Sequence, residues 1–153
     1  MRLPQIPRVE PAAGVSSSLD RATPKRVLLI EDSRDAREMF RMMLEFAGHT
    51  VFEAEDGDRG LKLLEIEHPD VAIIDIGLPG IDGYQVAKCI REQPNGRGML
   101  LLALTGYGFP SDYRRSAEAG FDHHLVKPVD LCELARLLGK LGERAATWTE
   151  TQI

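Results

Sequence analysis

The sequence predicts a doubly wound α/β domain, in which helices cover both faces of a five-stranded parallel sheet. Three observations lead to this prediction. Five short, mostly apolar runs have the length of strands, the residues between them show helical apolar spacing, and four of the runs end in a residue able to do chemistry. In sheets of this kind, functional groups gather beyond the carboxyl ends of the strands.

The predicted strands alternate with the predicted helices along the chain. Residues 27–30 and 71–74 are continuous apolar runs, as expected for strands covered on both faces. We expect ordered structure to begin at Lys25 or Arg26, just before the first strand. In chain order, the predicted strands are residues 27–30, 50–54, 71–74, 99–104 and 124–126.

The first two helices have clear end signals. Gly48 closes the first helix, and the second, anchored by Leu61 and Leu64, stops before Pro69. Spacing of i, i+3, i+4, i+7 defines one apolar face on the first helix. That face consists of Ala36, Met39, Phe40, Met43, Leu44 and Ala47.

Two further helices follow from the same spacing. One comes after the Gly- and Pro-rich loop 77–83 and is centred on residues 86–90. The other is the last helix, which Asp130 caps. Its predicted apolar face consists of Leu131, Leu134, Leu138 and Leu141.

The helix at residues 112–119, stopped by Gly120, is poor in large apolar side chains. Tyr113 and Ala117 are its best anchors, so we expect it to dock weakly and to belong to the least stable part of the fold. A movable output surface and an ordinary exposed helix both account for this pattern.

The composition is that of a soluble globular protein. Of the 153 residues, 43% are hydrophobic and 28% are charged, and the net charge of −5 disfavours nucleic-acid binding. No apolar run approaches the roughly 20 residues of a membrane-spanning helix, and the first residues lack the apolar core of a secretory signal. We therefore expect a cytoplasmic protein that binds no nucleic acid and does not insert into a membrane.

The chain is long enough for one domain with residues to spare. We divide it into a flexible linker or tail at residues 1–24, a domain at residues 25–141 and a C-terminal tail at residues 142–153. Cys89 and Cys132 lie far apart in the sequence, and we interpret both as buried reduced thiols rather than as a disulfide or metal site.

Polar residues stand at the ends of four predicted strands. They are Glu31 and Asp32, Asp75, Thr105, and Lys127. Because parallel strands point the same way, we expect these side chains to converge at one edge of the sheet. Each has an ordinary explanation by itself, such as a helix cap or a solvated surface group. Three acids, a hydroxyl and an ammonium on one edge need a joint explanation.

A bound divalent cation and a phosphoryl group supply that explanation. Clustered carboxylates raise one another's pKa unless a cation lies between them, and Mg²⁺ suits a site of carboxylates and waters. An aspartate of this set could then attack phosphorus, while a hydroxyl and an ammonium on the opposite side hold the phosphoryl oxygens. The strand-end pattern therefore predicts phosphoryl transfer to an aspartate at this edge.

Four motifs resemble the receiver domain of two-component response regulators. They are VLLIEDS at residues 27–33, IDIGLPGIDG at 74–83, ALTG at 103–106 and LVKP at 125–128. The resemblance covers about residues 26–141, with the motifs in order. It implies a flavodoxin-like fold with five parallel strands in the order 2-1-3-4-5.

The resemblance also implies how the residues act. Asp75 would be the phosphoacceptor, and Thr105 and Lys127 would complete the catalytic group by binding phosphoryl oxygens. Asp32 and Asp75 would bind Mg²⁺, or Mn²⁺ in its place, together with the main-chain carbonyl of Gly77, and Glu31 would act on the metal through water. A cis peptide bond is implied before Pro128.

The phosphoryl group would come from a histidine kinase or a histidine phosphotransfer protein. The response would be a switch of the surface formed by helix 112–119, strand 124–126 and the last helix. By itself, the domain would catalyse only its own phosphorylation and dephosphorylation. A homodimer through the last helix and its neighbours is a further implication, and the downstream protein partner is not identified.

His124 departs from the family pattern, which commonly has Tyr or Phe three residues before the Lys. Either the switch is muted, which we favour, or His124 moves together with Thr105 and responds to pH. Gly77 and Tyr107, two residues beyond Asp75 and Thr105, should set water access and phosphoryl lifetime, in a direction that the sequence does not fix.

Two other functions compete with the receiver interpretation. One is a constitutive interaction module that keeps the fold without turnover, which the complete set of site residues argues against. The other is a hydrolase of the dehalogenase class, which usually has a second acid where this chain has Gly77.

The origin of the domain also has two interpretations. It is either a free-standing receiver or one excised from a hybrid histidine kinase. We favour the second, because residues 1–4 and the Pro-rich stretch after them resemble the end of a kinase ATP-binding domain.

Overall fold

The computed structural model describes residues 24–106 and 110–139. The predictions for residues 1–23, Tyr107, Leu141 and the tail at 142–153 lie outside this part of the chain. The strands are β1 (Arg26–Ile30), β2 (Thr50–Ala54), β3 (Val71–Asp75), β4 (Leu100–Thr105) and β5 (His123–Val126). The helices are α2 (Arg34–Phe46), α3 (Gly57–Glu67), α4 (Gly83–Glu92), the short 3₁₀ helix η2 (Pro94–Gly96), α5 (Pro110–Ala119) and α6 (Leu131–Gly139).

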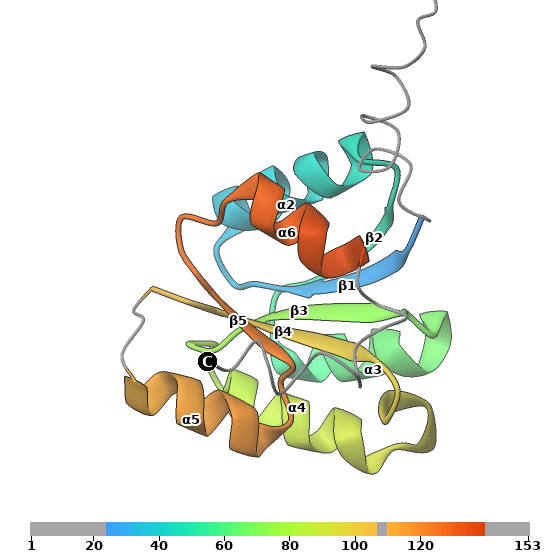
Figure 1. The fold of residues 1–153 in the computed structure, drawn as a ribbon. Helices are drawn as coiled ribbons and strands as arrows, with labels where there is room; N and C mark the ends of the chain where they lie inside the picture. Colours follow the sequence, from blue (N-terminus) through green and yellow to red (C-terminus); the bar gives the residue numbers. More distant parts are fainter. Residues whose placement is uncertain (1–23, 107–109, 140–153) are drawn as a thin grey trace, which may run out of the picture.

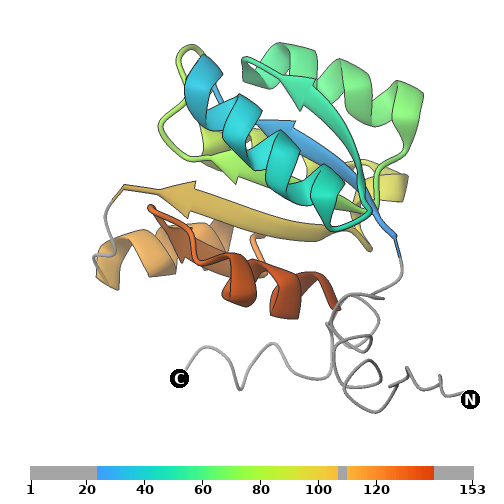
Figure 2. The ribbon, with the colours of Figure 1, turned by 90° about the horizontal axis from the view of Figure 1, so that it is seen from above.

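The five strands form one parallel sheet in the order β2-β1-β3-β4-β5, which confirms the predicted fold class. Helices α2 and α6 lie on one face of the sheet, and α3, α4 and α5 lie on the other (Figures 1 and 2). Every residue of β3 is buried, because this central strand is covered from both sides. The sequence predicted this strand from its continuous apolar run.

The apolar core has one layer on each side of the sheet. Val27 and Leu29 point toward α2 and α6, whereas Leu28 and Ile30 point toward α3 and α4. This alternation is the two-residue period of a strand, and it lets one strand contribute to both layers. Among the described residues, no helix is long and apolar enough to cross a membrane.

Helix α2 buries a narrower face than its sequence spacing suggested. Phe40 and Leu44 are buried, and each such side chain contributes about 1.5–3 kcal/mol. Met39 is 58% exposed and Ala47 is also exposed, so their inclusion in the predicted face was wrong. The helix touches the sheet edge along one stripe, and Met39 stands beside that stripe.

Helix α5 docks through a face that only partly matches the predicted one. Where the burial of its residues is described, Ser116 and Ala119 are buried, whereas Tyr113 is 43% exposed and Ala117 is exposed. The burial of Ser116 is tolerated because its hydroxyl lies 2.9 Å from Nδ1 of His124. Tyr113 still packs its ring on the His124 ring and is a partly exposed anchor, whereas Ala117 was wrong as an anchor.

The two cysteines are free but not buried as predicted. Cys89 is half-buried and Cys132 is exposed. Cys132 lies at the start of α6, where its main-chain N–H donates to Oδ1 of the capping Asp130 at 2.9 Å. Leu131 is also 46% exposed, although it lines the small pocket between α2 and α6. Apolar packing of α6 begins at Leu134.

Candidate functional site

The sheet register brings Glu31 and Asp75 together. β1 and β3 are in register up to Ile30 and Ile74, so the next residue of each strand lies at the same edge. Both acids are buried, Glu31 being 1% and Asp75 8% exposed. Burial of two carboxylates side by side is costly unless cationic or N–H groups accompany them.

The last two strands bring Thr105 and Lys127 to the same edge. Thr105 pairs with Val126 across β4 and β5, and the main-chain N–H of Lys127 donates to the carbonyl oxygen of Thr105 at 2.8 Å. Thr105 is 8% exposed. The peptide bond between Lys127 and Pro128 is cis, as the resemblance implied.

The ammonium group of Lys127 contacts both buried acids. Its Nζ lies 3.0 Å from Oε1 of Glu31 and 3.3 Å from Oδ2 of Asp75. One side chain therefore joins the ends of β1, β3 and β5 at a single point. The acids and the ammonium converge at one edge, as the strand-end pattern predicted.

The other Asp75 oxygen is held by the loop that follows β3. The main-chain N–H of Gly77 donates to Oδ1 of Asp75 at 2.9 Å. The start of α4 packs closely against this loop, and a Cβ at Gly83 would lie 2.6 Å from the main-chain oxygen of Asp75. Glycine at position 83 thus lets the helix approach the Asp75 backbone. A side chain there would push Asp75 out of place.

Glu31, Asp32 and Asp75 together could hold a divalent cation. One carboxylate oxygen from each lies within 4.8 Å of the others, which is close enough for ligands of one ion. Asp32 is exposed and the other two are buried, so the cluster opens to solvent on the Asp32 side. The donor set consists of oxygens, which suits Mg²⁺.

Burial and charge set the protonation behaviour of this cluster. Burial raises the pKa of Glu31, although hydrogen bonds from Ser33 N–H and Lys127 oppose the rise. Burial also lowers the pKa of Lys127, but its hydrogen bonds and charge interactions with Glu31 and Asp75 outweigh that effect and raise the pKa. Lys127 therefore keeps its positive charge beside the acids.

His124 lies on β5 with its side chain toward α5. Its Nδ1 is 2.9 Å from the Ser116 hydroxyl, and its ring packs on the ring of Tyr113 with centroids 4.3 Å apart. These contacts hold the ring against α5.

Sequence reasoning missed two residues that bind Glu31 in the loop between β1 and α2. The main-chain N–H of Ser33 donates to Oε2 of Glu31 at 3.1 Å, and the Ser33 hydroxyl caps α2. Nη1 of Arg37 donates to the main-chain oxygen of Glu31 at 2.8 Å. Ser33 could have been found as a helix cap before a helical run. An arginine on a helix gives no comparable signal.

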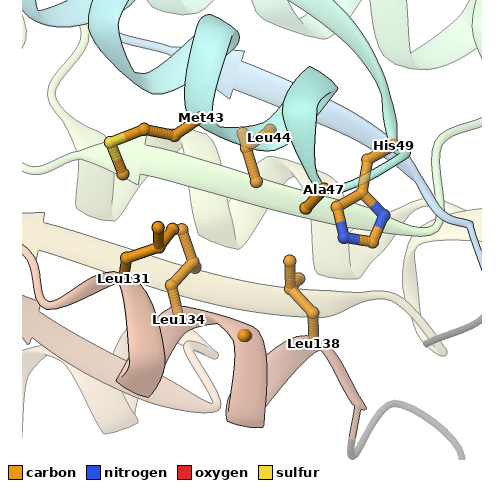
Figure 3. A pocket seen from close by; sticks show the side chains of 8 residues that line it. Met43, Leu44, Ala47, His49, Leu131, Leu134 and Leu138 are labelled. Carbon is orange, nitrogen blue, oxygen red and sulfur yellow. The ribbon is translucent and has the colours of Figure 1, made fainter. Parts of the chain in front are cut away.

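A small apolar pocket lies apart from the acidic edge, between α2 and α6 (Figure 3). Met43 and Leu131 flank one end, and His49 lies near Leu138 at the other. None of the acids or phosphoryl-binding candidates lines this pocket. The candidate functional site is the edge of the sheet where Glu31, Asp75 and Lys127 meet.

Comparison with known proteins gives a consistent result. A sequence model of the family described as the response regulator receiver domain matches residues 27–138. Response regulator MprA of Mycolicibacterium vanbaalenii is 35% identical over 111 residues, covering 72% of this chain and 47% of that protein. The chain thus spans about half the length of this curated relative.

Two solved structures are also similar. Chemotaxis protein CheY4 of Vibrio cholerae has a TM-score of 0.74 at 28% identity, over 78% of this chain and 99% of the other. The receiver domain of sensor histidine kinase PA1611 from Pseudomonas aeruginosa, with magnesium coordinated in its active-site cleft, has a TM-score of 0.72 at 31% identity. That match covers 78% of this chain and 99% of the other.

Proposed function

The chain belongs to the family of response regulator receiver domains, and on that premise we propose that Asp75 accepts a phosphoryl group in a Mg²⁺-dependent reaction. The observation that carries the proposal is the arrangement around Asp75. Its two carboxylate oxygens contact Gly77 N–H and Lys127 Nζ, and two more acids stand beside it. This arrangement provides a nucleophile in Asp75, a positive charge in the ammonium group of Lys127, and a group of acids that could bind a metal ion.

Each residue has a definable part in the transfer. A carboxylate oxygen of Asp75 forms a bond to phosphorus as the bond between phosphorus and the donor's imidazole nitrogen breaks. The electron pair of that bond stays on the leaving nitrogen. Lys127 and the Thr105 hydroxyl would stabilise the charge on the transferring oxygens. A bound Mg²⁺ would supply further neutralisation of those oxygens.

We assign the metal ligands from the acidic cluster. Asp32 and Asp75 would bind the ion directly, together with the main-chain carbonyl of Gly77, and Glu31 would act through water. Glu31 is the more deeply buried of the two strand-end acids, at 1% exposed against 8% for Asp75, which supports an indirect part. Mn²⁺ could replace Mg²⁺ in the same oxygen-rich site.

The proposed donor is a phosphohistidine of a histidine kinase or a phosphotransfer protein. Two similar solved structures are receiver domains of histidine kinases, from Syntrophus aciditrophicus and Pseudomonas aeruginosa. We propose that residues 25–141 form the receiver unit and that it works in the cytoplasm.

The proposed output is a change in the surface formed by α5, β5 and α6. Thr105 lies at the start of the connection to α5, and His124 contacts α5 through Ser116 and Tyr113. Two small residues, Ser116 and Ala119, are the buried residues of α5 within the described part of the chain. Weak docking makes α5 the helix that phosphorylation could move at least cost.

The test is intact-mass spectrometry of the full chain after incubation with acetyl phosphate, with and without Mg²⁺. We expect a gain of one phosphoryl group only with Mg²⁺, and loss of that gain in Asp75→Asn. Asp82→Asn is the matched control, because Asp82 caps α4 in the same loop and Asn caps equally well. An unchanged mass in the presence of Mg²⁺ would overturn the proposal.

A further inference from the structure

We propose that Arg37 is a positioning residue that holds the carboxylate of Asp32 where a divalent cation can bind. The inference rests on the proposed function, which makes Asp32 a metal ligand. It concerns a residue outside the four sequence motifs. Arg37 would contact neither the ion nor the phosphoryl group.

The side chain of Arg37 connects β2 with the loop between β1 and α2, which contains Glu31 and Asp32. It lies in the first turns of α2, and its side chain is 16% exposed. Nε of Arg37 lies 3.3 Å from Oε1 of Glu53 on β2, while Nη1 donates to the main-chain oxygen of Glu31 at 2.8 Å. The guanidinium group therefore bridges a fixed strand and the peptide unit between Glu31 and Asp32.

The backbone and side chain of Glu31 are anchored from several directions. Its N–H donates to the carbonyl oxygen of Ala54 at 3.1 Å, and its carboxylate receives Ser33 N–H and Lys127 Nζ. Arg37 occupies the remaining polar group, the carbonyl oxygen. That oxygen belongs to the same planar peptide as the nitrogen of Asp32.

Asp32 is held differently. Its side chain is exposed, and between described residues no hydrogen bond or ion pair engages its carboxylate. The direction of this carboxylate therefore depends on its backbone. Because Arg37 fixes the orientation of the peptide that precedes Asp32, it also fixes the starting point of the Asp32 side chain.

An arginine suits this task better than a lysine. The planar guanidinium presents several N–H donors in a fixed fork, so it can hold two acceptors at a set separation. Lysine would keep the positive charge but could not bridge Glu53 and the Glu31 carbonyl with the same geometry. Comparison of Arg37→Lys with Arg37→Met can therefore separate the effect of side-chain geometry from the effect of charge.

Positioning and simple electrostatics predict opposite effects on metal binding. A positive charge close to the acids repels a divalent cation, so removal of a merely electrostatic Arg37 would strengthen Mg²⁺ binding. Removal of a positioning Arg37 would weaken it, because Asp32 would sample other directions. The sign of the change in dissociation constant distinguishes the two.

Arg41 provides a matched control one turn further along α2. Its Nε lies 2.6 Å from Oε2 of the same Glu53, and it makes an ion pair with Glu45 at 3.5 Å. No described contact joins Arg41 to the Glu31–Asp32 peptide. Arg41→Met thus removes the same charge and a bond to the same partner without releasing that peptide.

The experiment is a Mg²⁺ titration of the full chain, followed by the NMR shifts of the Ser33 and Gly77 amides. We expect Arg37→Met to raise the Mg²⁺ dissociation constant about tenfold. Arg41→Met should change it less than about twofold, since a partly exposed charge is screened. Arg37→Lys should fall between wild type and Arg37→Met. Thermal unfolding confirms that each variant is folded at the titration temperature.

An unchanged or lower dissociation constant in Arg37→Met would overturn the inference, as would an equal increase in Arg41→Met. Should Arg37→Met fail to fold, Arg37→Lys decides: a raised dissociation constant supports positioning, and a wild-type value refutes it. Failure of the proposed function looks different, because wild-type protein would then show no Mg²⁺-dependent shift and no labelling of Asp75.

Discussion

The ammonium group of Lys127 lies closer to Glu31 than to Asp75, at 3.0 Å against 3.3 Å. The buried Glu31 thus depends on Lys127 for its cationic partner. Lys127 therefore serves the folded state as well as the proposed phosphoryl transfer.

Lys127→Met should reduce stability in a pH-dependent way. We expect the free energy of unfolding at pH 7, with chelator present, to fall by about 1–2 kcal/mol, because Lys127 is partly exposed. Burial already raises the pKa of Glu31 above its ordinary value of 4.5, and loss of the Lys127 hydrogen bond raises it further. The folded variant then takes up a proton before the unfolded chain does. The stability difference from wild type should shrink as pH falls toward 4.5, as measured by urea unfolding.

The double variant Glu31→Gln/Lys127→Met is the control for this effect. A neutral amide cannot titrate, so the double variant should lack the pH-dependent part of the loss. A Lys127→Met deficit that stays constant from pH 7 to pH 5 would contradict the explanation.

Arg91→Met should be the most destabilising of these substitutions, although Arg91 lies far from the acids. Its side chain donates to the carbonyl oxygens of Gly96, Met99 and Gly120 and pairs with buried Asp122 at 2.9 Å. Removal of one partner from a buried pair costs about 3–5 kcal/mol. Urea unfolding should show this loss, whereas exposed Arg97→Met should stay within about 0.5 kcal/mol of wild type.

His49 should make the fold sensitive to mild acid. Its Nδ1 accepts the main-chain N–H of Lys25 at 3.0 Å, and burial together with the charge of Lys25 lowers its pKa below 6.5. The unfolded chain therefore binds the proton first. The stability that neutral His49 contributes is fully present above pH 6.5 and is lost as pH falls through the lowered pKa.

The measurement is the melting temperature between pH 7.5 and pH 5. His49→Gln, which does not titrate, should flatten the decline relative to wild type. Equal slopes for wild type and His49→Gln would refute this account.

The contact between His124 and Ser116 should couple α5 to β5. A double-mutant cycle with Ser116→Ala and His124→Phe should give a coupling energy of about 0.5–1.5 kcal/mol in the unphosphorylated chain. Phenylalanine preserves the ring that packs on Tyr113 but cannot bond the hydroxyl. A coupling energy near zero would show that the 2.9 Å contact does not hold α5 in place.

The strands and the acidic edge followed from the sequence because their signals are local. A continuous apolar run such as 71–74 has few alternatives to a buried strand, and parallel strands must bring Asp75 and Lys127 to the same edge. Strand β2 was predicted residue for residue, β5 differs from its prediction by one residue at its start, and β4 differs by one residue at each end.

Side-chain partners across the fold were harder to predict. Ser116 faces inward because His124, on another element, satisfies its hydroxyl, and no helical period contains that information. Arg37 donates to a main-chain oxygen. Because every residue has such an oxygen, the sequence does not indicate which residue Arg37 contacts. Cys132 is exposed although it lies in a segment with helical apolar spacing, because spacing alone does not fix which residues of the first turn of a helix are covered.

The bridge from Lys127 to Glu31 joins residues 96 positions apart. During translation, Glu31 and Asp75 therefore leave the ribosome long before the ammonium group that contacts both of them in the folded domain. Under the proposed function, a nascent chain interrupted before β5 would carry the acceptor without the ammonium group that stabilises the transferring oxygens.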